Sequence, residues 1–223
     1  MEINLSPQLY TLIPDFKIAV IHYHNIEVGS SPQMLKGRLQ LFQEAIFFDL
    51  EEKNVADISE INEWRTIFKK TGKDPNRYRH SAEALYRRIK KQHYLQSVNS
   101  AIDLNNFFSL QYKMPLGIYD LKSVNDKVTI RIGEDGEEYE GLNGRLNHLR
   151  DIIVTADKNG PFGSPYIDSK RTSVSDKTKE ALQIIYLCPS MQVNDAKELA
   201  KSLQKMFLQI HGGTGSLEIL SRV

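Results

Sequence analysis

The chain has 223 residues, of which 40% are hydrophobic and 26% are charged, and its formal net charge at pH 7 is +1. This length and composition predict one globular domain without a membrane-spanning segment, because the longest apolar runs are far shorter than the roughly 20 residues that such a helix needs. The N-terminus lacks a secretory signal and the single cysteine, Cys188, excludes an intrachain disulfide, so we expect a cytoplasmic protein.

The first half of the chain is predicted to be mainly helical. Alternating β-branched residues over 14–28 indicate one strand that ends at Gly29. Apolar residues at helical spacing then predict helices over 31–53, over 59–70, from residue 81 onward and over 100–110. The first of these is expected to begin with Ser31 as its N-cap and Pro32 in its first turn.

The second half, after Gly117, changes to short strands and turns. Strands are predicted over 128–132, 152–156 and 182–187, with an Asp-Gly hairpin signature at 135–136 and turns at 141–144 and 157–160. A closing helix is expected to begin at Asn194 or Asp195 and to end at residues 212–213, followed by a loose tail. Helices first, strands second and one closing helix predict an α+β fold, a single domain whose mainly antiparallel sheet is flanked by helices.

The positive charge is concentrated in residues 65–94, which hold ten lysines and arginines against two acidic residues. Aromatic residues alternate with the arginines, and guanidinium groups bind phosphates while aromatic rings stack on unpaired bases. The segment therefore predicts an RNA-binding surface, with a solvated helix face that pairs with the acidic stretch at 51–63 as the alternative. The predicted phosphate contacts are Arg77, Arg79, Arg87, Arg88, Lys90 and Lys91.

Motifs for other chemistries are missing from the sequence. No glycine-rich phosphate loop follows a strand, and there is no serine nucleophile elbow. His22 and His24 share one face of a predicted strand, but no cysteine or carboxylate at ligand spacing accompanies them. Cys188 ends an apolar strand, which favours a buried thiol over a nucleophile. We therefore expect neither a metal nor a cofactor.

Residues 99–189 hold an ordered series of short motifs. They are NSAIDLNNF at 99–107, MPLGIYD at 114–120, VTIR at 128–131, GE at 136–137, LNG at 142–144, DIIV at 151–154, AD at 156–157, SV at 173–174 and Thr178. This order resembles the editing (tRNA-binding) domain of the bacterial phenylalanyl-tRNA synthetase beta chain. Residues 77–88, which precede the series, are similar to stand-alone members of that family.

The resemblance implies a free-standing editing-like domain that binds RNA, above all tRNA or aminoacyl-tRNA. It divides the chain into an N-terminal strand and helices (1–75), the family core (76–190) and a C-terminal helix with its tail (191–223). The chain is too short for an aminoacylation core, so the implied reaction is hydrolysis of an aminoacyl-tRNA ester in trans, with no ligase activity. Two alternatives are a non-catalytic module for an amino-acid-like metabolite and a protein-interaction domain that uses the basic helix.

The sequence departs from the family pattern at its pocket. The family's histidine after Pro-x falls on Gly117, and its glycine-rich pocket loop is replaced by residues 163–172. In that loop an aspartate suits an α-ammonium group and an arginine suits a carboxylate or phosphate. The alternative is a polar surface loop in which these two side chains pair locally. The predicted pocket residues are Leu142, Gly163, Asp168, Ser169, Arg171 and Thr172.

The catalytic candidates are Asp168 and His148. A histidine that follows an asparagine in a turn suits a general base, and a solvated turn histidine is the alternative. The polar residues Asp103, Asn105 and Asn106 lie on a predicted helix among apolar neighbours. They are expected mainly to satisfy buried backbone groups, with a place in the pocket wall as the alternative.

Overall fold

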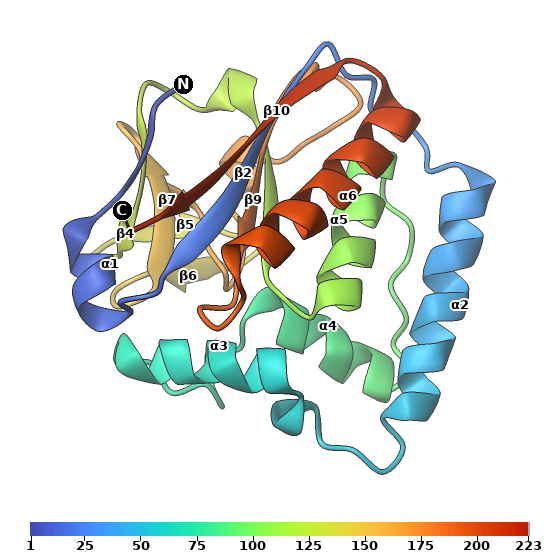
Figure 1. Ribbon diagram of the computed structural model, residues 1–223, viewed down its shortest axis with the longest axis horizontal. Coiled ribbons are helices and arrows are strands. Elements are labelled where there is room, and N and C mark those ends of the chain that lie inside the picture. The colour runs from blue at the N-terminus through green and yellow to red at the C-terminus, as the bar shows by residue number, and fades with distance from the viewer. Residues whose placement is uncertain (223) are drawn as a thin grey trace.

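A four-stranded antiparallel sheet joins distant parts of the chain at the centre of the molecule (Figure 1). This computed structural model describes residues 1–222. The strand order is β10 (Thr214–Ser221), β2 (Lys17–His24), β9 (Glu180–Tyr186) and β3 (Leu116–Asp120). Strands β2 and β9 are almost continuously apolar because layers cover both faces of the sheet.

A second four-stranded sheet packs against one of those faces. Its order is β1 (Ile3–Leu5), β4 (Val128–Ile132), β7 (Ile153–Asp157) and β8 (Gly160–Gly163). The first pair of strands is parallel and the other two pairs are antiparallel. A separate hairpin is formed by β5 (Glu138–Glu140) and β6 (Leu146–His148). The molecule is thus an α+β domain with mainly antiparallel sheets, as the sequence predicted.

Helices cover the other face of the central sheet. Helix α6 (Val193–His211) runs alongside β10 and β2 and packs on them, and α5 (Ser100–Tyr112) packs beside it against β3 (Figure 1). Three further helices form an outer layer with an apolar cluster of their own: α2 (Gln33–Asp49), α3 (Ser59–Lys70) and α4 (Ser81–Lys90). A short helix α1 (Pro7–Leu12) and three 3-10 turns complete the described fold: η1 (Val55–Asp57), η2 (Leu121–Ser123) and η3 (Lys170–Thr172).

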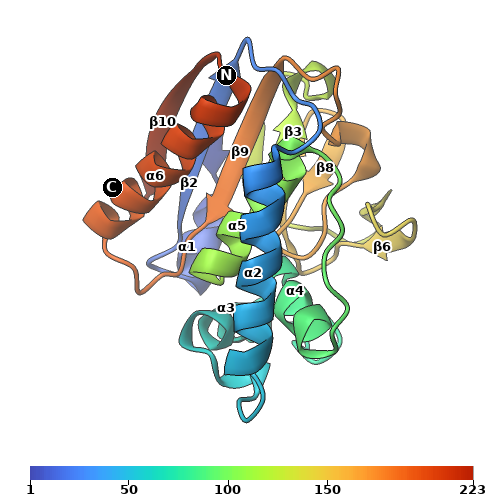
Figure 2. The same ribbon diagram turned by 90° about the vertical axis from the view of Figure 1, so that its right-hand side faces the viewer.

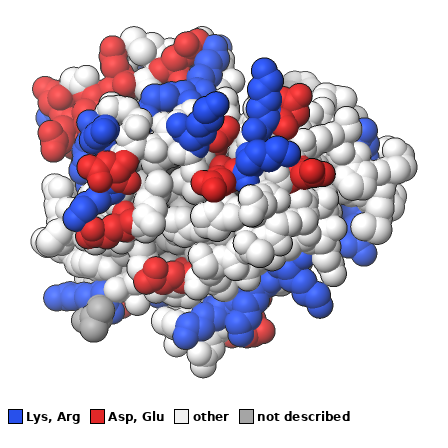
Figure 3. All heavy atoms as spheres, turned by 90° about the horizontal axis from the view of Figure 1, so that it is seen from above, with Lys and Arg blue, Asp and Glu red and all other residues white. Residues whose placement is uncertain are grey.

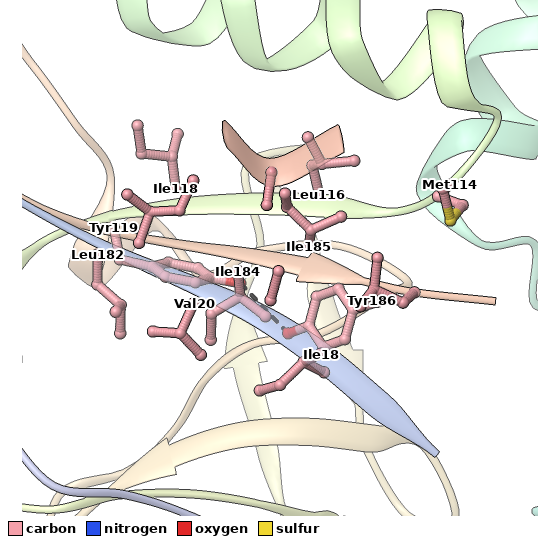
Figure 4. Packing of buried hydrophobic residues seen from close by; sticks show 14 of the residues in the cluster. Ile18, Val20, Met114, Leu116, Ile118, Tyr119, Leu182, Ile184, Ile185 and Tyr186 are labelled. Carbon is pink, nitrogen blue, oxygen red and sulfur yellow. Dashed lines mark hydrogen bonds between the residues drawn. The ribbon is translucent and has the colours of Figure 1, made fainter. Parts of the chain in front are cut away.

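The core alternates across the central sheet as a pleated strand requires (Figure 4). Leu116 and Ile118 of β3 point toward α5, while Tyr119 points toward the second sheet. Tyr119 and Tyr186 turn toward each other from neighbouring strands, with their hydroxyl oxygens 3.4 Å apart. Both tyrosines are fully buried, and they mark the inner end of the candidate site.

Local signals misplaced two helix starts and one strand. Ser31 does not cap α2: Pro32 occupies that position, and the Ser31 hydroxyl donates instead to Asp103 at 2.5 Å. Helix α6 begins at Val193, with Gln192 as its uncapped preceding residue, so the predicted start at Asn194 or Asp195 was wrong. The predicted loose tail was also wrong, because residues 214–221 pair with the free backbone edge of β2.

Two properties of the described residues bear on function. No helix within residues 1–222 has the length and apolar character that a membrane crossing requires. Cys188 is buried, and burial raises the pKa of its thiol, which keeps it protonated at neutral pH.

Candidate functional site

A cavity of about 610 Å³ lies between α4, α5, β3 and the loop that follows β8. Part of its wall is apolar and comes from α4, α5, β3 and the segment before β9: Leu85, Ile102, Leu116, Ile118 and Val174. Polar groups from α5 and the 163–172 loop enter the same space. Apolar walls with a few placed polar groups, at this volume, are typical of small-ligand sites.

The pocket loop is held by hydrogen bonds at several points. The Ser164 hydroxyl donates to the carbonyl of Ile167 (2.7 Å) and accepts from the backbone N–H of Tyr166 and of Ile167 (3.2 and 3.0 Å). The hydroxyl of Tyr139, from β5, lies within hydrogen-bond distance of both the Ser164 hydroxyl and the Ile167 carbonyl, and its single proton serves one of them at a time. The Leu142 N–H donates to the Asp168 carbonyl at 2.9 Å. These bonds tie the loop to itself, to β5 and to the turn that follows β5.

Asp168 presents one free carboxylate oxygen to the cavity. Its Oδ1 accepts from the Tyr119 hydroxyl (2.9 Å) and from the Ser164 N–H (3.2 Å). Its Oδ2 makes no hydrogen bond within residues 1–222, and the side chain lines the cavity. Burial raises the pKa of Asp168 to about 7, and the two hydrogen bonds oppose that rise. A cation that enters the cavity would therefore find an acceptor whose ionised form it stabilises.

Tyr119 is seated between two glycines. A Cβ at Gly117 would lie 2.0 Å from the Tyr119 hydroxyl oxygen, and one at Gly163 would lie 2.2 Å from it. Any side chain at either position would displace the ring, so both glycines serve to place the hydroxyl beside Asp168. Gly163, a predicted pocket residue, thus lies behind the cavity wall and supports it.

The hydroxyl of Tyr119 is part of a buried chain. It lies 3.4 Å from that of Tyr186, which lies 2.7 Å from the hydroxyl of Thr155. Burial raises the pKa of both tyrosines, so they act as neutral donors and acceptors. Sequence reasoning missed the role of Tyr119, because only the fold brings β3 beside the loop.

The polar residues of α5 differ in whether their side chains already have hydrogen-bond partners. Asn105 also lines the cavity, and both of its polar atoms are engaged, since its amide nitrogen donates to the Leu116 carbonyl and its amide oxygen accepts from Gln183. Asn106 lines the cavity, and its amide makes no hydrogen bond within residues 1–222. Asp103 lies outside the wall and accepts hydrogen bonds from Ser31, Ser97 and the Val98 N–H.

The remaining predicted pocket residues divide into two groups. Leu142, Ser169 and Thr172 line the cavity beside Asp168. Arg171 does not, because its guanidinium binds both carboxylate oxygens of Asp157 at 2.9 and 3.0 Å. His148 also lies outside the cavity wall, exposed on β6 and 3.0 Å from the Glu138 carboxylate.

A second hollow of about 430 Å³ shares part of its wall with the cavity and is lined by basic side chains. Its wall includes five of the six predicted phosphate contacts: Arg77, Arg79, Arg87, Arg88 and Lys91. Both hollows share the side chains of Ala84, Arg88, Asn143, Tyr166 and Ile167. Lys90 is the exception, since its ammonium donates to the Lys53 carbonyl at 2.6 Å on another side of α4.

Most of the positive charge in this groove is uncompensated. Arg87 pairs with the buried carboxylate of Glu83 at 2.8 Å, and Arg65 pairs with the same oxygen at 2.7 Å. The other arginines of the groove and Lys91 form no ion pair within residues 1–222, and no described ion pair joins the acidic stretch at 51–63 to the basic segment. By contrast, basic and acidic side chains are interspersed over the face shown in Figure 3.

No group of three or more histidine, cysteine, aspartate or glutamate side chains in the described part of the chain is arranged to hold a metal ion.

Similarity to known proteins extends over most of the chain. Residues 63–205 match the family described as the B3/4 domain. The chain is 37% identical over 221 residues to the uncharacterized protein YhzB of Bacillus subtilis, a match that covers 99% of this chain and 100% of YhzB.

Shorter matches connect the chain to a synthetase subunit. It is 35% identical over 68 residues to the phenylalanine–tRNA ligase beta subunit of Paramagnetospirillum magneticum, which is 30% of this chain and 8% of that subunit. In Fusobacterium nucleatum the same subunit is 24% identical over 108 residues, 47% of this chain and 14% of the subunit. These matches confirm the predicted resemblance and span only a small part of each subunit.

Among solved structures, an N-terminal fragment of the phenylalanyl-tRNA synthetase beta subunit from Pyrococcus horikoshii aligns with a TM-score of 0.48 and 11% identity. The alignment covers 100% of this chain and 54% of that fragment.

Proposed function

Because the chain belongs to the B3/4 domain family, we propose that it binds tRNA and hydrolyses the ester of an aminoacyl-tRNA in trans. The observation that supports this proposal is that the cavity and the basic groove lie side by side and share Arg88 and four other side chains in their walls. An aminoacyl-tRNA has the matching form, since its amino acid is esterified to the ribose of the terminal nucleotide and the phosphodiester backbone follows next to it.

In this proposal the cavity holds the aminoacyl group. The free Oδ2 of Asp168 accepts from the α-ammonium, and the free amide of Asn106 offers a second polar contact. The apolar wall from α5 and β3 surrounds the amino-acid side chain. A charged hydrogen bond of this kind contributes about 1.5 to 3 kcal/mol, so loss of the carboxylate should weaken binding about 10- to 100-fold.

The groove holds the phosphates of the tRNA acceptor end. Five basic side chains line it, and each phosphate that they neutralise releases counterions. For a single-stranded segment, five contacts predict a slope of about −3.5 for log affinity against log salt concentration. Tyr166 lies in the walls of both hollows, where its ring can stack on the terminal base.

The reaction is ester hydrolysis. Water attacks the ester carbonyl carbon, the bond between that carbon and the ribose oxygen breaks, and the ribose oxygen takes a proton as the amino acid leaves. His148 lies outside the cavity, so the protein contributes chiefly by holding the ester in one orientation next to water. Asp168 is the ionisable group that holds the substrate, with Tyr119 as its positioning residue.

Deacylation is the test of this function. Purified protein is incubated with a panel of correctly and incorrectly charged tRNAs, and release of each amino acid is followed against the uncatalysed rate. We expect release from one charged species, lost in Asp168→Asn and retained in His148→Ala, which alters an exposed histidine outside the cavity. Release that is equal in both variants would remove Asp168 from the site, and no release from any species would rule out the esterase.

The groove has a matched test of its own. Arg77→Gln/Arg88→Gln removes two groove contacts and should lower the salt slope of tRNA binding by about 1.4. Lys90→Gln makes a comparable change on the same segment but outside the groove, so it should leave the slope unchanged. Equal effects of the two changes would show that the basic segment binds RNA without using this groove.

A second function is favoured by the scarcity of acid–base groups at the site. Asp168 is engaged with the ammonium in the proposed pose and His148 lies outside. A binding module for a free amino-acid-like metabolite needs only the cavity. Calorimetric binding of a free amino acid that is lost in Asp168→Asn, with no deacylation of any charged tRNA, would establish this alternative.

A further inference from the structure

A further cavity, of about 370 Å³, lies beside the C-terminal end of α2, and we call it the α2 cavity. Its wall comes from α2 and the turn after it, from α4, from the end of α5 and from the residue before α3. Figure 2 shows α2 lying over α5, with α3 and α4 on either side of its lower end. Tyr86 of α4 lines this cavity, whereas Leu85 and Arg88 of the same helix line the cavity of the candidate site. The two cavities share no residue, so they are separate sites.

The inner wall of the α2 cavity is apolar. Ile46 and Leu50 are buried in the apolar cluster of the outer helical layer, and Phe42 and Ile58 pack against that cluster. The hydroxyl of Tyr86 donates to a carbonyl of α5 at 2.8 Å, so it already has its partner and the ring faces the cavity. The volume is at the lower end of the range for small-ligand sites, which suits one small molecule with an apolar group.

Two groups of opposite charge line the same cavity without a partner. The carboxylate of Asp49 and the ammonium of Lys53 form no ion pair and no side-chain hydrogen bond within residues 1–222, with each other or with any other group. Lys113, the third charged residue of the wall, is by contrast paired with Glu60 at 3.1 Å. One free negative charge and one free positive charge therefore border an apolar space.

The position of Asp49 strengthens its attraction for a cation. Asp49 is the last residue of α2, and the last turn of this helix, residues 46–49, contains no basic residue. The C-terminal end of a helix is negative, so a carboxylate there lacks local compensation and a cation is favoured. Burial, followed by the charges of Glu60 and Asp49, raises the pKa of the Tyr86 hydroxyl, so this carboxylate acts on the cavity wall. A ligand ammonium would meet both the carboxylate and the helix end.

We propose that the α2 cavity binds a free α-amino acid with an apolar side chain. Its α-ammonium binds Asp49 at the end of α2, its α-carboxylate binds Lys53, and its side chain enters the apolar space. An α-amino acid carries both charges on one carbon atom, which matches two unpaired groups four residues apart in the chain. A fatty acid or an alkyl amine would satisfy one of these groups and leave the other unpaired.

Isothermal titration calorimetry of the full chain with L-leucine and L-phenylalanine tests the proposal, and at least one of them should bind. The amino acid that binds is then compared with analogues that lack one charged group. These are isocaproate and isoamylamine for leucine, and phenylpropionate and phenethylamine for phenylalanine. Each analogue should bind about 10-fold more weakly, because it loses one charged hydrogen bond. An analogue that binds as tightly as the amino acid would overturn the two-charge recognition.

Charge variants locate the ligand. Asp49→Asn and Lys53→Gln should each weaken binding about 10-fold, and both change exposed side chains, so the fold should be retained. The matched controls are Asp57→Asn and Lys36→Gln, which make the same changes at exposed residues outside the cavity and should bind like the wild type. Circular dichroism checks that every variant is folded.

The same titrations in Asp168→Asn separate this site from the candidate site. That change weakens any amino acid held in the cavity of the candidate site, and it should leave binding in the α2 cavity intact. Deacylation does not enter the measurement, so the outcome is independent of the proposed function. The absence of binding by both amino acids, an unchanged affinity in Asp49→Asn and Lys53→Gln, or loss of binding in Asp168→Asn would each overturn the proposal.

Discussion

Replacement of Asp168 by asparagine should make the protein more stable at alkaline pH while it removes the ligand contact. Asparagine has nearly the same shape, so its carbonyl can still accept from the Tyr119 hydroxyl and the Ser164 N–H. What changes is the charge. The wild-type carboxyl must ionise in a buried place, whereas the amide stays neutral at every pH.

The sign and size of the effect follow from the two pKa values. Burial raises the pKa of Asp168 from 3.8 to about 7. Between those values the folded chain binds a proton that the unfolded chain has lost, so the free energy of unfolding falls as pH rises through this window. Three pKa units correspond to about 4 kcal/mol as an upper limit. Because the carboxyl faces an open cavity, water reduces this amount, and we expect about 2 kcal/mol.

Urea unfolding at several pH values between 4 and 8 measures this effect. Trp64 is the only tryptophan and is fully buried, so its fluorescence reports the transition directly. The free energy of unfolding of Asp168→Asn should match the wild type near pH 4 and exceed it by about 2 kcal/mol at pH 8. Contributions of other groups cancel in the difference. Asp176→Asn, at an exposed aspartate, is the control. A difference that does not vary with pH would refute the assignment of a buried, proton-binding carboxyl at the site.

Three further outcomes are expected. Gly163→Ala should displace the Tyr119 ring and lower the free energy of unfolding by about 1 to 3 kcal/mol. Gly29→Ala is the control, because a Cβ at that position would meet no atom within 4 Å. Equal denaturation midpoints of the two variants would contradict the packing around Tyr119. Burial lowers the pKa of His80 from 6.5 to about 3, so the free energy of unfolding should fall as pH drops through that window. His80→Asn keeps an N-cap acceptor but does not titrate there, so its free energy of unfolding should vary less with pH in an acid titration. Arg171→Ala should destabilise the fold by about 2 kcal/mol, because it removes the partner of the buried Asp157 carboxylate. Ligand binding measured by calorimetry should be unchanged. Loss of ligand binding by a variant that is still folded would show that Arg171 does belong to the pocket.

The sequence predicted the helices and strands well where one periodicity extended over several turns. Helix α3, for example, was predicted over the same residues that it occupies, because its four inward side chains recur at helical spacing. Strand β10 could not be predicted in this way. Residues 214–221 form a strand because β2 offers a free edge, and that edge exists only after the central sheet has formed.

The candidate site was only partly visible in the sequence for a similar reason. Asp168 and Thr172 could be proposed from residue type within one loop. The partner of Arg171 could not, since Asp157 is 14 residues away and meets it only across the turn after β7. Tyr119 lacks any local signal, and Asn106 could be proposed for the pocket wall only as an alternative, because their roles depend on β3 and α5 meeting the loop.

The contact between α4 and the pocket loop favours a ligand that occupies both hollows. The N–H of Ser81, at the start of α4, donates to the carbonyl of Pro165 in the loop at 2.8 Å. Beside it the rings of Tyr78 and Tyr166 pack edge to face, with centroids 5.7 Å apart. A phosphate bound by Arg88 would therefore contact the helix that is hydrogen-bonded to the pocket loop. A free metabolite in the cavity would contact the loop and one side of α4, whereas in the proposed function a charged tRNA also contacts the basic groove on α4. Loss of deacylation in Ser81→Pro, which removes that N–H at a helix start that tolerates proline, would support this coupling if tRNA binding and the fold were retained.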